Sequence, residues 1–451
     1  MTLTARTLGA LLLVAMMRSE VAAQNTSDAG GVLTVDAAIA IALAHNRELA
    51  GATLGVESAE DAIAIARRRR FPQFDIDAQV AQSLTITSYT FPAGSFGTYE
   101  ATGPIPGESS TVESERKPSL YANATVAQPL TQLLRLNIGV AASEASRDIE
   151  RERLRAAEQK VASDVRRVYY ALLQTDTALV ASKESIAVAQ EFSRVMRARL
   201  SEQTALKADG LDADLSVARA EQRHLALGHT RETQVEQLNR LLGRKLDTPV
   251  ALAPVAESAP ADEDLETLVA RALDARPEIR EARLRVEQAQ LDLRSKVAER
   301  IPDVSLTLSY ITFVNVDVLP RNLGSIGVQV SWEPFDWGRR AREAKVKARA
   351  VEQARLARIE TEASVAAEVS ASLRRVREAR SGLQVARLEE LAARERARVK
   401  VELLRVKATL RPDALQAQAQ LLEASASHQE ALSSYWTARA EFDRAIGENV
   451  R

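Results

Sequence analysis

The chain has 451 residues, with 60 basic and 61 acidic side chains, 4 % aromatic residues and no cysteine. The balanced charge gives no general attraction to nucleic acid, and a sequence without cysteine has neither a disulfide framework nor thiolate metal ligands. Alanine mixed with Arg, Glu, Gln and Leu is typical of long helices and coiled coils rather than of an ordinary globular core.

The N-terminal residues have the pattern of a secretory signal. Arg6 precedes an apolar run from Leu8 to Met17, and the small residues around Ala23 suit cleavage before Gln24. We therefore predict that residues 1–23 are a cleaved signal peptide. No later segment has the ~20 apolar residues of a transmembrane helix, so a membrane-spanning form of this chain would have to cross with strands.

Two alternating apolar and polar segments occur in each half of the chain. They predict strands at about 73–87, 119–128, 303–313 and 324–333. Each strand has one apolar and one polar face, and aromatic residues gather at the strand ends, as in outer-membrane barrels. A half-buried sheet of a water-soluble protein shows the same alternation, and remains an alternative from this pattern alone.

The remaining sequence is predicted to be helical. Apolar residues recur at the coiled-coil period along two long segments, about 137–206 and 338–408. Shorter helices, about 212–243 and 412–446, are predicted to return antiparallel from tight turns. A helix of about 70 residues is roughly 105 Å long. Such helices have little core of their own and must pack side by side with others.

The chain also repeats itself. A shift of 230 positions places Val35 on Leu265 and Leu43 on Leu273, and a shorter shift of 204 later places Gly243 on Gly447. This similarity predicts two tandem copies of one helix, β-hairpin and long-helix-pair unit. The predicted organisation is a first repeat at 24–246, a proline-rich connector at 247–263 and a second repeat at 264–451.

The predicted strands require an assembly if they lie in a membrane. Four strands are too few to close a barrel, and an open sheet edge in lipid leaves unpaired backbone groups at a cost of several kcal/mol each. The chain is therefore expected to oligomerise until the sheet closes. A dimer would supply eight strands and a trimer twelve (two and three times four), and the strands alone do not choose between them.

In this arrangement the chain resembles the TolC-like outer-membrane factor family, also described as outer membrane efflux proteins. The likeness covers essentially the whole mature chain and rests on four segments, which are Leu33–Ala38, Asn46–Leu49, Arg276–Ile279 and Val330–Gly338. Two further points of likeness are Phe71-Pro72 and Ile301-Pro302, each at the start of a predicted strand.

The resemblance implies a mainly α protein with a transmembrane β-barrel. Three identical chains would form a 12-stranded barrel continuous with a 12-helix periplasmic α-barrel, in the outer membrane of a Gram-negative bacterium. The implied function is a passive exit duct of a tripartite efflux or type I secretion system, gated at its periplasmic helix tips. The implied partners are outer-membrane lipid, a periplasmic adaptor and an inner-membrane pump.

The resemblance also places the periplasmic entrance at the turns between paired long helices, about 208–215 and 408–415. The candidate gate and adaptor-contact residues are Asp209, Gly210, Leu211, Asp212, Asp214, Arg411, Pro412, Asp413 and Gln416. Asp413 matches a position where some members carry an acidic ring, whereas Gln416 replaces the companion acid. Helix capping is an equal alternative, because carboxylates at Asp212 and Asp413 would favour the helix dipole.

No pattern in the sequence predicts catalysis, a metal site or a cofactor. The four histidines lack paired ligand spacing, and there is no phosphate-binding glycine loop or nucleophile elbow. The basic run 67–70 is expected at a helix end near lipid headgroups rather than on nucleic acid. The alternative function is a secreted periplasmic coiled-coil adaptor without a pore, which would show one long hairpin instead of two copies.

Overall fold

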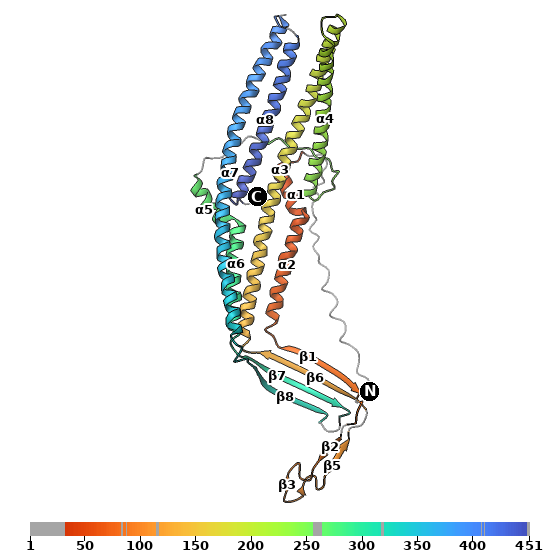
Figure 1. The fold of residues 1–451 in the computed structure, drawn as a ribbon, viewed down its shortest axis with the longest axis vertical. Coiled ribbons are helices and arrows are strands. Elements are labelled where there is room, and N and C mark those ends of the chain that lie inside the picture. The colour runs from red at the N-terminus through yellow and green to blue at the C-terminus, as the bar shows by residue number, and fades with distance from the viewer. Residues whose placement is uncertain are drawn as a thin grey trace, which may run out of the picture.

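The computed structural model describes residues 32–82, 84–86, 88–113, 117–255, 264–316, 320–406, 408–409 and 411–448. The predicted signal peptide and residues 256–263 of the predicted connector lie outside the described residues. The molecule is elongated, with the sheet towards one end and two long helical hairpins reaching the other (Figure 1).

The elements follow the chain in two similar series. The first series is α1 (Val35–His45), α2 (Arg47–Arg68), β1 (Gln73–Gln82), β6 (Pro118–Pro129), α3 (Leu133–Ser201) and α4 (Lys207–Leu241). The second is α5 (Leu265–Ala275), α6 (Pro277–Ala298), β7 (Asp303–Val314), β8 (Asn322–Ser331), α7 (Arg339–Arg405) and α8 (Arg411–Ala445).

Each series begins with two helices separated by a sharp break. Asn46 lies between α1 and α2, where its side-chain oxygen accepts a hydrogen bond of 2.8 Å from the backbone N–H of Glu48. Its side-chain amide donates to the carbonyl of Leu241 at 3.0 Å, which ties the break to the end of α4. In the second series Pro277 starts α6, a position where its missing N–H costs nothing.

The two hairpins form one antiparallel sheet of four strands, in the order β1-β6-β7-β8. Since β6 belongs to the first series and β7 to the second, the centre of the sheet joins both halves of the chain. The β1–β6 ladder ends where Gln82 faces Pro118, although the alternating pattern continues to Ile86. Pro118 has no N–H to donate, so the strand is shorter than the predicted 73–87.

The connection between β1 and β6 carries a small folded extension. It contains β2 (Ser88–Phe91) paired with β5 (Ser110–Glu113), and β3 (Thr98–Tyr99) paired with β4 (Gly103–Pro104). The extension lies at the end of the sheet away from the helices (Figure 1). The sequence predicts no strands here, because strands of two or four residues are too short to show a period.

The helices form two successive four-helix layers. Next to the sheet the packing order is α2-α3-α6-α7, and farther away it is α4-α3-α8-α7. The helices α3 and α7, of 69 and 67 residues, pass through both layers. At 1.5 Å per residue each is roughly 100 Å long, so the coiled-coil period predicted their length well.

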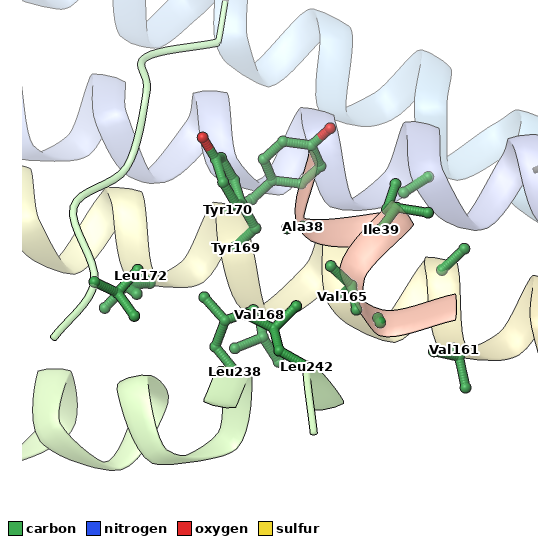
Figure 2. Packing of buried hydrophobic residues seen from close by; sticks show 14 of the residues in the cluster. Ala38, Ile39, Val161, Val165, Val168, Tyr169, Tyr170, Leu172, Leu238 and Leu242 are labelled. Atoms are coloured by element: carbon green, nitrogen blue, oxygen red, sulfur yellow. The ribbon is translucent and has the colours of Figure 1, made fainter. Parts of the chain in front are cut away.

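The main hydrophobic cluster lies where α1 packs on α3, close to the end of α4 (Figure 2). Ile39, Tyr169, Leu172 and Leu238 are fully buried in it. The hydroxyl of Tyr169 donates to the carbonyls of Leu33 and Ala253, at 2.8 and 2.7 Å, and so holds two chain segments against α3. A second cluster packs α5 and the start of α6 against α7 and α8. These clusters stiffen the middle of the molecule.

We predict that Gly243→Ala destabilises the fold. Gly243 ends the first helical hairpin with a φ of +70°, and an added Cβ would lie 2.3 Å from the carbonyl oxygen of His45. The strained backbone together with this clash should cost about 2 kcal/mol or more. Thermal unfolding of the detergent-extracted protein, followed by far-ultraviolet circular dichroism, measures the effect.

The matched control is Gly139→Ala. Gly139 lies inside α3, and an added Cβ there meets nothing within 4 Å. This substitution should leave the melting temperature unchanged or raise it, because alanine favours a helix over glycine by about 1 kcal/mol. Equal melting temperatures for the two variants would contradict the role assigned to Gly243.

Candidate functional site

The strand register collects the apolar residues of the sheet on one face. Ile76 of β1 faces Ala124 of β6, Ala124 also faces Tyr310 of β7, and Leu308 of β7 faces Ile326 of β8. Large side chains on this face are exposed, including Phe74, Ile76, Val80, Leu308, Tyr310, Ile326, Val328 and Val330. Water-soluble monomers rarely expose a contiguous apolar patch of this kind. The face is therefore suited to an apolar surrounding.

The opposite face of the sheet is polar and is the less exposed of the two along β7. Ser305, Thr307 and Ser309 are half-buried there, whereas Leu306 and Leu308 between them are exposed. Polar side chains also bond across strands, as Ser309 does with Ser325 at 2.7 Å between hydroxyl oxygens. In the half-buried sheet of a water-soluble protein, the apolar face is the buried one. Along β7 the polar face is the less exposed one instead, so the alternative of an ordinary half-buried sheet does not fit.

Exposed aromatic residues lie where the sheet meets the helices. Phe71, Trp332, Phe335 and Trp337 are all exposed, and the exposed fraction of Trp337 reaches 87 %. The rings of Phe335 and Trp337 contact edge to face, with centroids 4.7 Å apart. Amphipathic rings of this kind favour the boundary between lipid and water. They mark the helical end of the apolar face.

The sheet is open at both edges. In the part of the chain that the structure describes, β1 pairs only with β6 and β8 pairs only with β7. The two helical layers are open on the same sides, with α2 and α4 at one side and α7 at the other. Large apolar side chains remain exposed on these outer helices, namely Leu54 of α2, Leu225 of α4, and Leu356 and Leu388 of α7. Among the described residues, each layer thus presents two edges that lack a neighbour within the chain.

The first helical tip differs from the prediction in its boundaries. The helix α3 ends at Ser201 and α4 begins at Lys207, so the return helix starts five residues before the predicted 212. Asp209 explains the early start, because its carboxylate accepts a hydrogen bond of 3.0 Å from the backbone N–H of Leu206. Asp212 therefore lies beyond the first turn, and the expected dipole role belongs to Asp209.

The other candidate residues of the first tip have distinct surroundings. Gly210 is buried, and an added Cβ would lie 3.3 Å from the side chain of Leu200, so glycine allows the two helices to approach closely. Leu211 and Leu206 are exposed instead. They give the tip an apolar outer surface that is available for contact.

Asp214 joins the two helices of the first hairpin. Its carboxylate accepts hydrogen bonds from the hydroxyl of Ser193 at 2.7 Å and from the guanidinium of Arg197 at 2.8 Å. These two bonds, that of Ser193 first, hold the pKa of Asp214 below its usual value. Its charge is therefore kept at neutral pH and is committed to α3.

The second helical tip carries the remaining candidates. The helix α8 begins at Arg411, and Pro412 and Asp413 lie in its first turn. Asp413 accepts a hydrogen bond of 3.0 Å from the hydroxyl of Thr409, which fits a capping role, while Gln416 is exposed. Both tips lie at the end of the molecule farthest from the sheet, on separate hairpins (Figure 1). The structure thus gathers the candidates into two groups.

Two polar pairs inside the hairpins were not predicted. His224 contacts the hydroxyl of Ser182 at 2.7 Å, and His428 contacts the carboxylate of Glu390 at 2.6 Å. The two histidines are 204 residues apart, the same shift that relates Gly243 to Gly447, and this regularity was the available signal. Each pair links a long helix with its return helix, so the role is structural.

The side chains and helices of the described ranges also bear on other kinds of site. No group of three or more His, Cys, Asp or Glu side chains there has the arrangement of a metal site. Within the same ranges, none of the helices is both long and apolar enough to cross a bilayer.

An exposed apolar sheet face with aromatic residues at its border, continued by long helical hairpins, defines an outer-membrane type of protein. The model of the outer membrane efflux protein family matches residues 38–244 and 268–448. The chain belongs to this family, and its place is the outer membrane. The family membership argues against the alternative that the chain is a secreted coiled-coil adaptor.

Solved structures of outer-membrane channels share the fold. The CmeC outer membrane channel of Campylobacter jejuni has a TM-score of 0.75 at 16 % identity, over 92 % of this chain and 85 % of that chain. The outer membrane protein VceC of Vibrio cholerae has a TM-score of 0.72 at 14 % identity, over 92 % and 97 %. The open state of the MtrE channel of Neisseria gonorrhoeae has 0.69 at 17 %, over 92 % and 89 %. No curated protein matches the chain.

We predict that Val328→Lys impairs assembly in the outer membrane. Val328 lies on the exposed apolar face of β8. A lysine on the lipid face of a barrel costs about 2–4 kcal/mol near the middle of the bilayer. The amount of folded protein recovered from outer-membrane fractions should therefore fall well below that of the wild type.

The control is Gln329→Lys, which changes the next residue of the same strand on the polar face. Its recovery should stay close to that of the wild type, because the added charge meets water. Equal losses for the two variants would show that the apolar face of the sheet does not face lipid.

Proposed function

We propose that three copies of this chain close into a 12-stranded barrel continuous with a 12-helix tunnel, and that this assembly is a passive exit duct. The observation that carries the proposal is the open edge. The sheet and both helical layers are each four elements wide, and all are open on the same two sides. A single rotation that places β8 of one copy against β1 of the next copy would also place α7 of the first copy against α2 and α4 of the next.

The membrane makes closure compulsory. Each unpaired backbone group in the hydrocarbon core costs several kcal/mol, so β1 and β8 need a partner strand. Two copies would supply eight strands, a number whose interior is filled by side chains. Three copies supply twelve, which favours a water-filled lumen lined by the polar face. The trimer is therefore the assembly that combines closure with a passage.

The helical tips are the proposed periplasmic gate and adaptor contact. The exposed residues Leu206 and Leu211 at the first tip, and Val406 at the second, offer apolar contact sites on the outer surface. Three copies of Asp413 would add their fields at the entrance. We propose that a periplasmic adaptor and an inner-membrane pump engage these tips, as in tripartite efflux or type I secretion.

One of the solved structures that share the fold is of a channel in an open state. The MtrE channel is described in an open state. In this chain the inner contacts of the first tip, such as Asp214 with Arg197, lie within one hairpin rather than between the two hairpins. The end of each hairpin is thus able to move as a unit beyond the packing of α3 on α8, which supports gating by a change in the distances between the tips.

Cysteine crosslinking tests the trimer, because the chain has no native cysteine. The variant carries Asp77→Cys in β1 and Gly327→Cys in β8, at opposite edges of the sheet. A flexible bis-maleimide should link neighbouring chains in outer membranes and produce a ladder that ends at the trimer. A ladder that ends at the dimer, or continues past the trimer, would refute the proposed closure.

The control pair is Ala122→Cys with Thr312→Cys. These residues face each other on β6 and β7 inside one chain. Their crosslink should shift the monomer band without forming a ladder. A ladder from this pair would indicate random collisions between chains. The ladder of the edge pair would then not support a trimer.

Conductance in planar bilayers tests the entrance. We predict that Asp413→Asn lowers the preference of the channel for cations over anions, because three negative charges leave one constriction together. The reversal potential in a salt gradient measures this preference. Gln416→Asn is the matched control, since Gln416 is exposed near the same tip and its substitution changes no charge. An unchanged reversal potential for Asp413→Asn would assign Asp413 to capping alone.

A further inference from the structure

A partly enclosed cavity of about 280 Å³ lies where α1, α3 and α8 meet, away from both the sheet and the tips. Its chemically active lining consists of Asp36 from α1, Arg166 and Tyr170 from α3, and Trp436, Arg439 and Asp443 from α8. Both repeats therefore contribute to it. The proposed conduction path uses none of these residues.

The cavity contains polar groups that lack hydrogen-bond partners, and among the described residues these include the buried Oδ1 of Asp443. Tyr170 is only 7 % exposed, and its hydroxyl makes no hydrogen bond among the described residues. Within the same part of the chain, the buried indole N–H of Trp436 has no hydrogen-bond partner. Buried polar groups in folded proteins are nearly always paired, so the unpaired indole N–H of Trp436 indicates a missing acceptor at the cavity.

The charges in the cavity favour an anion as that acceptor. Arg439 contacts the carboxylate of Asp443 at 2.7 Å. Arg166 has no hydrogen bond or ion pair of its own within the described part of the chain. Its guanidinium is permanently charged and presents several N–H donors in a fixed plane, which matches two oxygens of one ligand. Arg166, which acts on Asp443 through its charge alone, and the unpaired N–H of Trp436 thus line the same space.

We propose that this cavity binds a small anion through a carboxylate or phosphate group. Such groups offer several oxygen acceptors at once, and inorganic phosphate or a short dicarboxylate fits a cavity at the lower end of the size range of ligand sites. Because α1 and α3 belong to the first repeat and α8 to the second, a bound anion would join the two halves beside the main hydrophobic cluster. The proposal does not depend on the channel function.

Asp443 gives the site a pH dependence. Burial raises its pKa to about 6, against the opposing effect of Arg439. The other groups that act on it are Glu448 beyond the end of α8 and Arg166 on α3, while Asp36 of α1 shares the cavity. Below this pKa the carboxyl group is mostly neutral and no longer repels an anion. For an anion whose own charge does not change over this range, binding should therefore be tighter at a pH of about 5.5 than at about 7.5.

Isothermal titration calorimetry on the full-length protein in detergent tests the proposal. Inorganic phosphate and succinate are the two probes, and sodium chloride at equal ionic strength is the reference. We expect one saturable site per chain. Arg166→Gln should weaken the affinity about tenfold or more, because it removes charge-assisted hydrogen bonds. Tyr170→Phe should weaken it about fivefold, as expected for one neutral hydrogen bond.

Tyr169→Phe is the matched control for Tyr170→Phe. The hydroxyl of Tyr169 is already bonded to the carbonyls of Leu33 and Ala253 and does not line the cavity. This variant should unfold at a lower temperature and still bind the anion with the affinity of the wild type. Far-ultraviolet circular dichroism checks that every variant is folded before titration.

The outcomes separate the possible sources of the ligand. Saturation by phosphate alone assigns a phosphate site, saturation by succinate alone assigns a carboxylate site, and saturation by both supports the shared chemistry. Heats that match those of sodium chloride would overturn the proposal. So would an affinity that folded Arg166→Gln and Tyr170→Phe retain unchanged, because the anion would then bind elsewhere.

Discussion

The unpaired edges of the sheet govern the architecture of this protein. Strands β1 and β8 each offer a row of backbone donors and acceptors to a neighbour, and lipid supplies none. The helices repeat this arrangement, since α7 is the outer helix of both layers on one side. In the proposed assembly, such a chain is one segment of a closed wall, and this position would account for its exposed apolar residues.

The sheet and the helical part contribute to stability in different ways. Apolar residues such as Ile326 point to the exposed face, where burial by the chain itself contributes nothing. The fold instead depends on the clusters around Tyr169 and Val369, which pack the short helices α1 and α5 against the long ones. These clusters hold α3 and α7 in place, and α3 and α7 follow directly on the strands β6 and β8.

The two repeats share a plan but differ in detail. Among the described residues, the small extension lies in the first repeat, between β1 and β6, whereas both return helices carry an aspartate at their third residue, Asp209 in α4 and Asp413 in α8. The donor-rich cavity is built from both repeats, with Tyr170 from one half and Trp436 from the other. The similarity of the two series gives the sheet its two hairpins and the helical part its two long hairpins, while the cavity lies where the two series meet.

The amino-acid sequence alone was enough to predict the four strands of the main sheet, the long helices and the family resemblance, because period two and period 3.5 are properties of residues close together in the chain. It also indicated which face of each strand is apolar. The folded chain was needed to show that β6 pairs with β7, that Thr307 lies on the less exposed face of the sheet while Ile326 lies on the exposed one, and that Asp209 starts α4. Strand pairing and burial depend on contacts between distant residues, and a local pattern contains no information about them.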